Sequence, residues 1–153
     1  MSSSFSNELT NFLIENHGKN IVFTNGCFDI LHSGHVMYLN LAREQGDILI
    51  LGLNSDLSVK KLKGDRRPIN NQEERKYLLE NLSSVSFVEI FEEETPLNLI
   101  KFIKPSLLVK GGDWKTEQIV GSDFVMKNGG TVKSLAFKQG FSTTNIIDRI
   151  RNL

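Results

Sequence analysis

Strand-like and helix-like segments alternate about five times along this chain of 153 residues, and this alternation constrains the fold most. The strand-like segments are short apolar runs rich in β-branched residues. They are IVFTN (21–25), DILILGLN (47–54), SVSFVEI (84–90), SLLVKGG (106–112) and TVKSLAF (131–137). Residues 47–54 are almost continuously apolar, which is typical of a strand covered on both faces. The sequence therefore predicts an α/β fold, a Rossmann-like, doubly wound parallel sheet of five strands.

Helix-like segments lie between and around these runs. They are NELTNFLIEN (7–16), VMYLNLARE (36–44), NQEERKYLLENL (71–82), PLNLIKFI (96–103), SDFVMKNGG (122–130) and STTNIIDRIR (142–151). No repeat, low-complexity segment or linker divides the chain. We expect one domain over residues 1–153, with an N-terminal helix within 1–18 and a C-terminal helix within 142–153.

The composition excludes several classes of protein. Eighteen basic residues balance eighteen acidic ones, so no global field favours nucleic acid. The single cysteine, Cys27, excludes an intramolecular disulfide and a multi-cysteine zinc site. No apolar run approaches the roughly 20 residues that span a bilayer, and residues 1–13 lack the pattern of a signal peptide. We expect a cytoplasmic protein that binds neither nucleic acid nor membrane.

Two of the three histidines, His32 and His35, lie in the stretch TNGCFDILHSGHVMYL (24–39), which allows three interpretations. Both could bind a metal together with Cys27 and Asp29, although Gly34 would weaken a helix that presents them on one face. Both could be ordinary surface or core residues. Alternatively, the end of a strand and the start of a helix could bind phosphate, because helix N-termini present free N–H groups and glycines permit close approach.

Polar residues follow four of the expected strands, in TNGCFD, NSD, KGGDW and GFSTTN. The carboxyl ends of parallel strands meet at one edge of a sheet, and ligands bind there where the strand order reverses. Taken singly these are ordinary turn residues. Together they predict one shared site.

The motif His32-Ser33-Gly34-His35 matches the HxGH motif of the nucleotidylyltransferase superfamily. The chain closely resembles the D-glycero-β-D-manno-heptose 1-phosphate adenylyltransferases, bacterial enzymes of ADP-heptose synthesis. The resemblance continues through LGLNSD (51–56), KLKGDRRPI (61–69), EER (73–75), LVKGGDW (108–114), IVGSDFV (119–125) and GFSTTNII (140–147). In many bacteria this domain is fused to a sugar kinase. Because 153 residues leave no space for a kinase, the chain resembles the stand-alone form.

The resemblance implies a set of site residues. Catalytic roles fall to His32, His35 and Lys63, and contacts to the substrate to Asp29 and Lys63. Nucleotide-binding roles fall to Thr24, Asn25, Gly26, Cys27, Phe28, Gly34, Asn54, Arg67, Arg75, Lys110, Gly111, Gly112, Asp113, Ser142, Thr143 and Thr144. The run KKLKGDRR (60–67), with five cations in eight positions, is expected to be a mobile loop that clamps anions.

The implied reaction transfers AMP from ATP to a sugar 1-phosphate, with Mg²⁺ bridging the triphosphate oxygens and no metal bound by protein side chains alone. The resemblance also implies a homodimer. Two alternatives stay open at this point. One is a CTP-dependent cytidylyltransferase, such as a glycerol-3-phosphate cytidylyltransferase. The other is a nucleotide-binding regulatory module without turnover.

Overall fold

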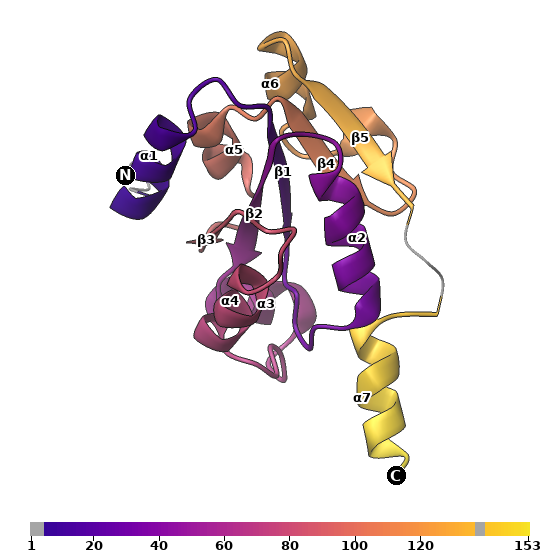
Figure 1. Ribbon diagram of the computed structural model, residues 1–153. Helices are drawn as coiled ribbons and strands as arrows, with labels where there is room; N and C mark the ends of the chain where they lie inside the picture. The colour runs from indigo at the N-terminus through magenta and orange to yellow at the C-terminus, as the bar shows by residue number, and fades with distance from the viewer. Residues whose placement is uncertain (1–4, 137–139) are drawn as a thin grey trace.

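A five-stranded parallel sheet forms the centre of the protein in the computed structural model, which describes residues 5–136 and 140–153 (Figure 1). The strands are β1 (Ile21–Gly26), β2 (Ile48–Asn54), β3 (Phe87–Phe91), β4 (Leu107–Gly111) and β5 (Thr131–Leu135). Their order across the sheet is β3-β2-β1-β4-β5, and all four pairings are parallel. The predicted fold class is therefore confirmed. Phe137, at the end of the last predicted strand, lies outside the described residues.

Helices cover both faces of the sheet. They are α1 (Asn7–Glu15), α2 (Ser33–Arg43), α3 (Asp56–Lys63), α4 (Gln72–Glu80), α5 (Leu97–Ile103), α6 (Ser122–Lys127) and α7 (Thr143–Arg151), with a 3-10 turn at Thr116–Gln118. Side chains of α2 and α4 pack with Leu49, Leu51 and Leu53 of β2 on one face. Side chains of α1, α5 and α6 pack with Ile50 of the same strand on the other. All seven residues of β2 are buried, as its continuous apolar character predicts.

The basic run 60–67 differs from the prediction of a loop. Its first four residues form the last turn of α3, which ends at Gly64 with a φ of 98°. Ser55 caps this helix by accepting a hydrogen bond from the N–H of Ser58, and Val59 packs into the interior. The helix is difficult to recognise in the sequence because charged side chains occupy many of its positions and leave little apolar periodicity.

The order of the strands reverses at β1. The chain moves outward from β1 to β2 and β3, and then returns to place β4 on the other side of β1. The carboxyl ends of β1 and β4 therefore flank the crevice where doubly wound folds bind ligands. The turn with both histidines follows β1 directly. None of the helices in the described residues is long and apolar enough to cross a membrane.

Candidate active site

The loop that joins β1 to α2 has a strained backbone. Phe28 and Ile30 have φ values of 47° and 53°, in the left-handed region that residues other than glycine rarely occupy. For a β-branched residue such as Ile30 this conformation is a genuine outlier. Strain of this kind persists only where the surrounding structure holds it, and it clusters at functional sites. Asp29, between the two residues, makes the hydrogen bonds that hold this loop.

Asp29 is buried and connects the loop to two distant segments. Its carboxylate accepts hydrogen bonds from Nε of Arg67 at 2.7 Å and from the backbone N–H groups of Ile69 and Asn70 at 2.8 and 2.9 Å. Its backbone carbonyl accepts a hydrogen bond from the Thr143 hydroxyl at 2.6 Å. Burial alone would raise the pKa of Asp29, but the hydrogen bonds from Asn70, Ile69 and Arg67 outweigh burial and lower it.

This arrangement changes the interpretation of Asp29. The sequence predicted a contact between its carboxylate and the substrate. In the structure, both carboxylate oxygens bind protein donors, and the side chain has no exposed surface. Asp29 is therefore placed to position the histidine loop against the residues after α3 and the start of α7.

His32 and His35 cap the start of α2 together. Nδ1 of His32 accepts a hydrogen bond from the backbone N–H of His35 at 3.4 Å, and Nδ1 of His35 accepts one from the N–H of His32 at 3.3 Å. The two rings stack with their centroids 3.8 Å apart. A neutral imidazole that accepts at Nδ1 carries its proton on Nε2. Neither Nε2 has a protein hydrogen-bond partner among the described residues, so both Nε2–H groups are available to a ligand.

Burial favours the neutral form of both rings. It lowers the pKa of His32, and burial together with the neighbouring His32 lowers the pKa of His35 to about 4. Neutral imidazoles can donate hydrogen bonds but carry no charge, so in this state a cation near a phosphate has to be a lysine or an arginine.

We expect the imidazole of His35 to stay neutral at pH values well below 6.5, which is the ordinary pKa of a histidine side chain. NMR titration of the imidazole resonances measures this pKa. Unfolded chains take up this proton near pH 6.5, whereas the folded protein resists it down to about pH 4. The contribution of His35 to stability is therefore lost as the pH falls from 6.5 towards 4. A titration midpoint near 6.5 for His35 would contradict the burial of its ring.

Gly34 allows the start of α7 to approach the histidines. A Cβ atom at this buried position would lie 2.7 Å from Cβ of Phe141 and 2.9 Å from Cε1 of His32. The Phe141 ring lies nearly parallel to the His32 ring, with centroids 6.5 Å apart. Any larger residue at position 34 would push the two helix starts apart. Phe141 was not among the predicted site residues, and GFSTT in the sequence was the signal that could have found it.

The predicted residues at the start of α7 have different surroundings. The hydroxyl oxygen of Ser142 caps the helix by accepting a hydrogen bond from the N–H of Asn145 at 3.0 Å. The Thr143 side chain donates to Asp29, and Thr144 is exposed. The first-turn N–H groups of α7 carry the positive end of the helix dipole, which favours phosphate. A role for these three residues in triphosphate binding stays a prediction.

Two arginines predicted to contact phosphate are bound to other parts of the protein. Arg67 pairs with Asp29 at 2.7 Å. Arg75 is 1% exposed and donates to the carbonyls of Cys27, Asn54 and Asn70 at 2.7–3.0 Å.

Arg75 also pairs with Asp56 at 2.8 Å. Through these bonds it ties together the segments that follow β1 and β2. Arg75 is therefore placed to hold these segments together in the interior.

The other predicted residues near β1 and β2 are largely buried. The Thr24 and Tyr38 hydroxyls share a hydrogen bond of 2.7 Å, and the Asn54 side chain donates to Ser58 at 2.9 Å. Burial raises the pKa of the Cys27 thiol, which disfavours the reactive thiolate form. Asn25 and Gly26 are half-buried at the end of β1. Lys63 is exposed.

The residues after β4 line a separate hollow of about 360 Å³. Gly112 and Asp113 line it with Trp114, Lys115, Ser134 and Ala136. The ammonium group of Lys110 lies 4.9 Å from the centre of the Trp114 ring, and Nε1 of Trp114 donates to the Gly111 carbonyl. This hollow shares no lining residue with the cavity beside His32, so the structure does not merge the two groups of predicted residues into one pocket.

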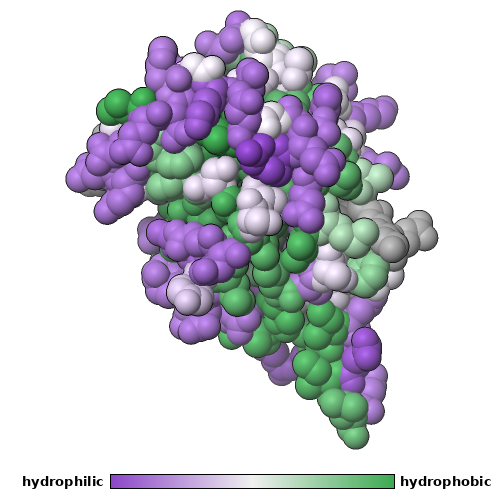
Figure 2. All heavy atoms as spheres, in the orientation of Figure 1, coloured by the Kyte–Doolittle hydropathy of each residue, from purple (hydrophilic) through white to green (hydrophobic). Residues whose placement is uncertain are grey.

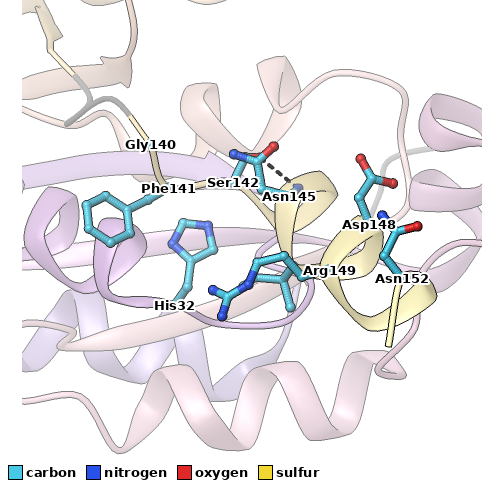
Figure 3. Close-up of a pocket in the computed structure, with 9 residues that line it drawn as sticks. His32, Gly140, Phe141, Ser142, Asn145, Asp148, Arg149 and Asn152 are labelled. Carbon is cyan, nitrogen blue, oxygen red and sulfur yellow. Dashed lines mark hydrogen bonds between the residues drawn. The ribbon is translucent and has the colours of Figure 1, made fainter.

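The cavity beside His32 has a volume of about 510 Å³ and extends along α7 (Figure 3). Its lining residues are His32, Gly140, Phe141, Ser142, Asn145, Ile146, Asp148, Arg149 and Asn152. Only His32 and Ser142 of these were predicted. In the part of the chain that the structure describes, no three His, Cys, Asp or Glu side chains are grouped so as to hold a metal ion.

A histidine turn at the switch point of a doubly wound sheet is the arrangement of an α/β nucleotide-binding protein. The cytidylyltransferase-like family matches residues 23–149. This chain belongs to that family.

Curated relatives include the bifunctional protein HldE of Aliarcobacter butzleri, 60% identical over 138 residues, and that of a Nitratiruptor species, 56% identical over 145 residues. These matches cover 90% and 95% of this chain but only 28% and 30% of the relatives. They support the resemblance inferred from sequence.

Solved structures agree on the fold. A lipopolysaccharide core biosynthesis protein from Thermoplasma volcanium is 26% identical with a TM-score of 0.64, over 79% of this chain and 98% of that protein. Pantothenate synthetase from Thermus thermophilus is 14% identical with a TM-score of 0.61, over 90% of this chain and 65% of the synthetase. The second likeness shows the fold alone.

Proposed function

We propose that this protein transfers the AMP moiety of ATP to D-glycero-β-D-manno-heptose 1-phosphate, which gives ADP-heptose and pyrophosphate for the lipopolysaccharide core. The observation that carries the transfer reaction is the pair of Nε2–H donors, from His32 and His35, at the switch point of the sheet. The choice of heptose rests on the family resemblance and on the identity to the HldE proteins.

The chemistry requires positioning more than acid–base catalysis. The second pKa of a phosphate monoester is about 6, so the attacking oxygen of the sugar phosphate is already ionised at neutral pH. The protein must bring two anions together and stabilise the charge that develops around the α-phosphorus. Preorganised neutral donors such as the two imidazoles serve this purpose, and Lys63 is an exposed cation that can approach the sugar phosphate.

Mg²⁺ fits this site as an ion carried by the triphosphate. The described residues offer no group of three acidic, histidine or cysteine ligands, and Mg²⁺ usually keeps several waters while it binds substrate phosphates. When bound, the ion neutralises charge on the leaving group. The homodimer and the cytoplasmic location stay predictions.

The test is pyrophosphate release from ATP, CTP and GTP, each with a panel of sugar and polyol phosphates. We expect the fastest release from ATP with the heptose 1-phosphate, and mass spectrometry should identify ADP-heptose as product. The match to the cytidylyltransferase-like family favours one second candidate, a glycerol-3-phosphate cytidylyltransferase. Equal or faster release from CTP with glycerol 3-phosphate would establish that candidate. No release with any pair would favour a regulatory nucleotide-binding module.

A further inference from the structure

The positive charge that a triphosphate needs is scarcer in the structure than in the sequence. Arg67 pairs with the buried Asp29, and Arg75 is enclosed by protein acceptors. Lys110 lies over Trp114, beside the other hollow. Burial lowers the pKa of both histidines, which favours their neutral forms. Among the described residues that line the cavity beside His32, Arg149 is the one lysine or arginine.

Arg149 has the required position. It lies on α7 and lines the same cavity as His32 and Ser142. Figure 3 shows its guanidinium group pointing toward His32, whereas the Asp148 carboxylate points away from that histidine. Among the residues that the structure describes, no carboxylate or carbonyl binds the Arg149 guanidinium. All five of its N–H donors are thus available to a ligand.

The shape of α7 explains why Arg149 faces the cavity. Asn145, Arg149 and Asn152 follow one another at spacings of four and three residues, which places them on one side of the helix. Figure 2 shows hydrophobic side chains gathered along the visible side of α7, with hydrophilic ones beside them. The hydrogen bond from Thr143 to the Asp29 carbonyl fixes the first turn of the helix beside the histidine loop. The polar side of α7 is thereby held against the cavity.

The geometry of the reaction decides which phosphates Arg149 can reach. The sugar phosphate oxygen forms a bond to the α-phosphorus, and the bond from that phosphorus to the bridging oxygen breaks. The electron pair leaves with pyrophosphate, and no proton is transferred. The attacking and leaving oxygens lie roughly in line on opposite sides of the phosphorus. Lys63 is the last residue of α3, and Arg149 lies on α7. Asp29 in the histidine loop is bonded to Arg67, which follows α3, and to Thr143 at the start of α7, so the loop contacts both segments.

We propose that Arg149 binds the β- and γ-phosphates of the nucleotide and the pyrophosphate that they become, on the α7 side of the histidines. This proposal rests on the proposed nucleotidyl transfer. The planar guanidinium matches a pyrophosphate because two parallel N–H groups can bind two phosphate oxygens at once. Arg149 is a nucleotide-binding residue that the sequence did not predict.

Calorimetric titration with magnesium pyrophosphate tests this assignment without any sugar substrate. Arg149→Gln should weaken pyrophosphate binding by about tenfold or more. Arg149→Lys keeps the positive charge but loses the planar guanidinium group. Its affinity for pyrophosphate should therefore lie between that of Arg149→Gln and that of the native protein. Arg151→Gln is the matched control, because Arg151, like Arg149, is exposed on the same helix but does not line the cavity. It should bind pyrophosphate as the native protein does.

Steady-state kinetics provide a second measurement. Arg149→Gln should raise KM for ATP and relieve product inhibition by pyrophosphate, with KM for the sugar phosphate unchanged. The proposal would be overturned if Arg149→Gln bound pyrophosphate as tightly as the native protein, or if Arg151→Gln lost as much pyrophosphate affinity. It would also be overturned if the native protein did not bind pyrophosphate. A different outcome is that the native protein binds pyrophosphate but has no transferase activity, while Arg149→Gln loses the binding. That result would refute the proposed function and support the role of Arg149.

Discussion

His35→Ala is expected to lower kcat by at least about 10²–10³-fold, the usual cost of removing one preorganised donor from a transition state. The Nε2–H group of His35 stabilises charge that develops only as the α-phosphate is attacked, so ATP affinity should change much less. Steady-state rates and calorimetric ATP binding measure the two effects separately. His17→Ala, which alters an exposed histidine outside the site, should leave both values unchanged.

His32 needs a different substitution because it occupies the N-cap position of α2. Asparagine is among the best N-cap residues, so His32→Asn retains a hydrogen bond to the N–H of His35 while it removes the imidazole donor. We expect a loss of kcat similar to that of His35→Ala, with a melting temperature close to that of the native protein. A near-normal kcat in both variants would show that the histidines are only helix-start residues.

Arg75→Met is expected to lower the free energy of unfolding by about 3 kcal/mol or more. Three buried or half-buried carbonyls lose their donors, and each unsatisfied group costs about 1–3 kcal/mol. We assign little of the loss to the ion pair, because the Asp56 side chain is 40% exposed and can return to water. Urea unfolding, monitored by circular dichroism, measures the change.

Arg66→Met is the control for Arg75→Met, since Arg66 is exposed and exposed substitutions usually change stability by less than about 0.5 kcal/mol. The alternative role of Arg75, a direct contact to phosphate, makes the opposite prediction. It would leave the unfolding free energy nearly unchanged and raise KM for ATP.

The cations show how far sequence reasoning extends in this protein. The charge run 60–67 and Arg75 stand out in the sequence, and they lie near the histidine loop in the structure. Their partners, however, are 38 and 48 residues away along the chain, at Asp29 and at the carbonyl of Cys27. No local pattern reveals such a contact. Arg149 gives no signal in the sequence at all, because an arginine near the end of an amphipathic helix usually faces solvent.

The helix α3 was missed for a related reason. Its buried side is narrow, with Ser58 and Val59 as its buried residues, while lysines fill its last turn. A 3.6-residue apolar period cannot be recognised in so few positions. The polar Ser58 is nevertheless buried because Asn54 donates a hydrogen bond to it. The burial therefore depends on the neighbouring strand and cannot be inferred from residue type.

The sequence by itself determined the parallel α/β fold and the place of the histidine motif at the end of β1, because hydrophobic periodicity and turn residues act over a few neighbouring positions. The tertiary structure decided what each polar side chain does. Burial lowers the pKa of His35, Asp29 pairs with Arg67, and the position of α7 places Arg149 in the same cavity as His32. The physical reason is that charge and hydrogen-bonding capacity are shared among residues that meet only after the chain has folded.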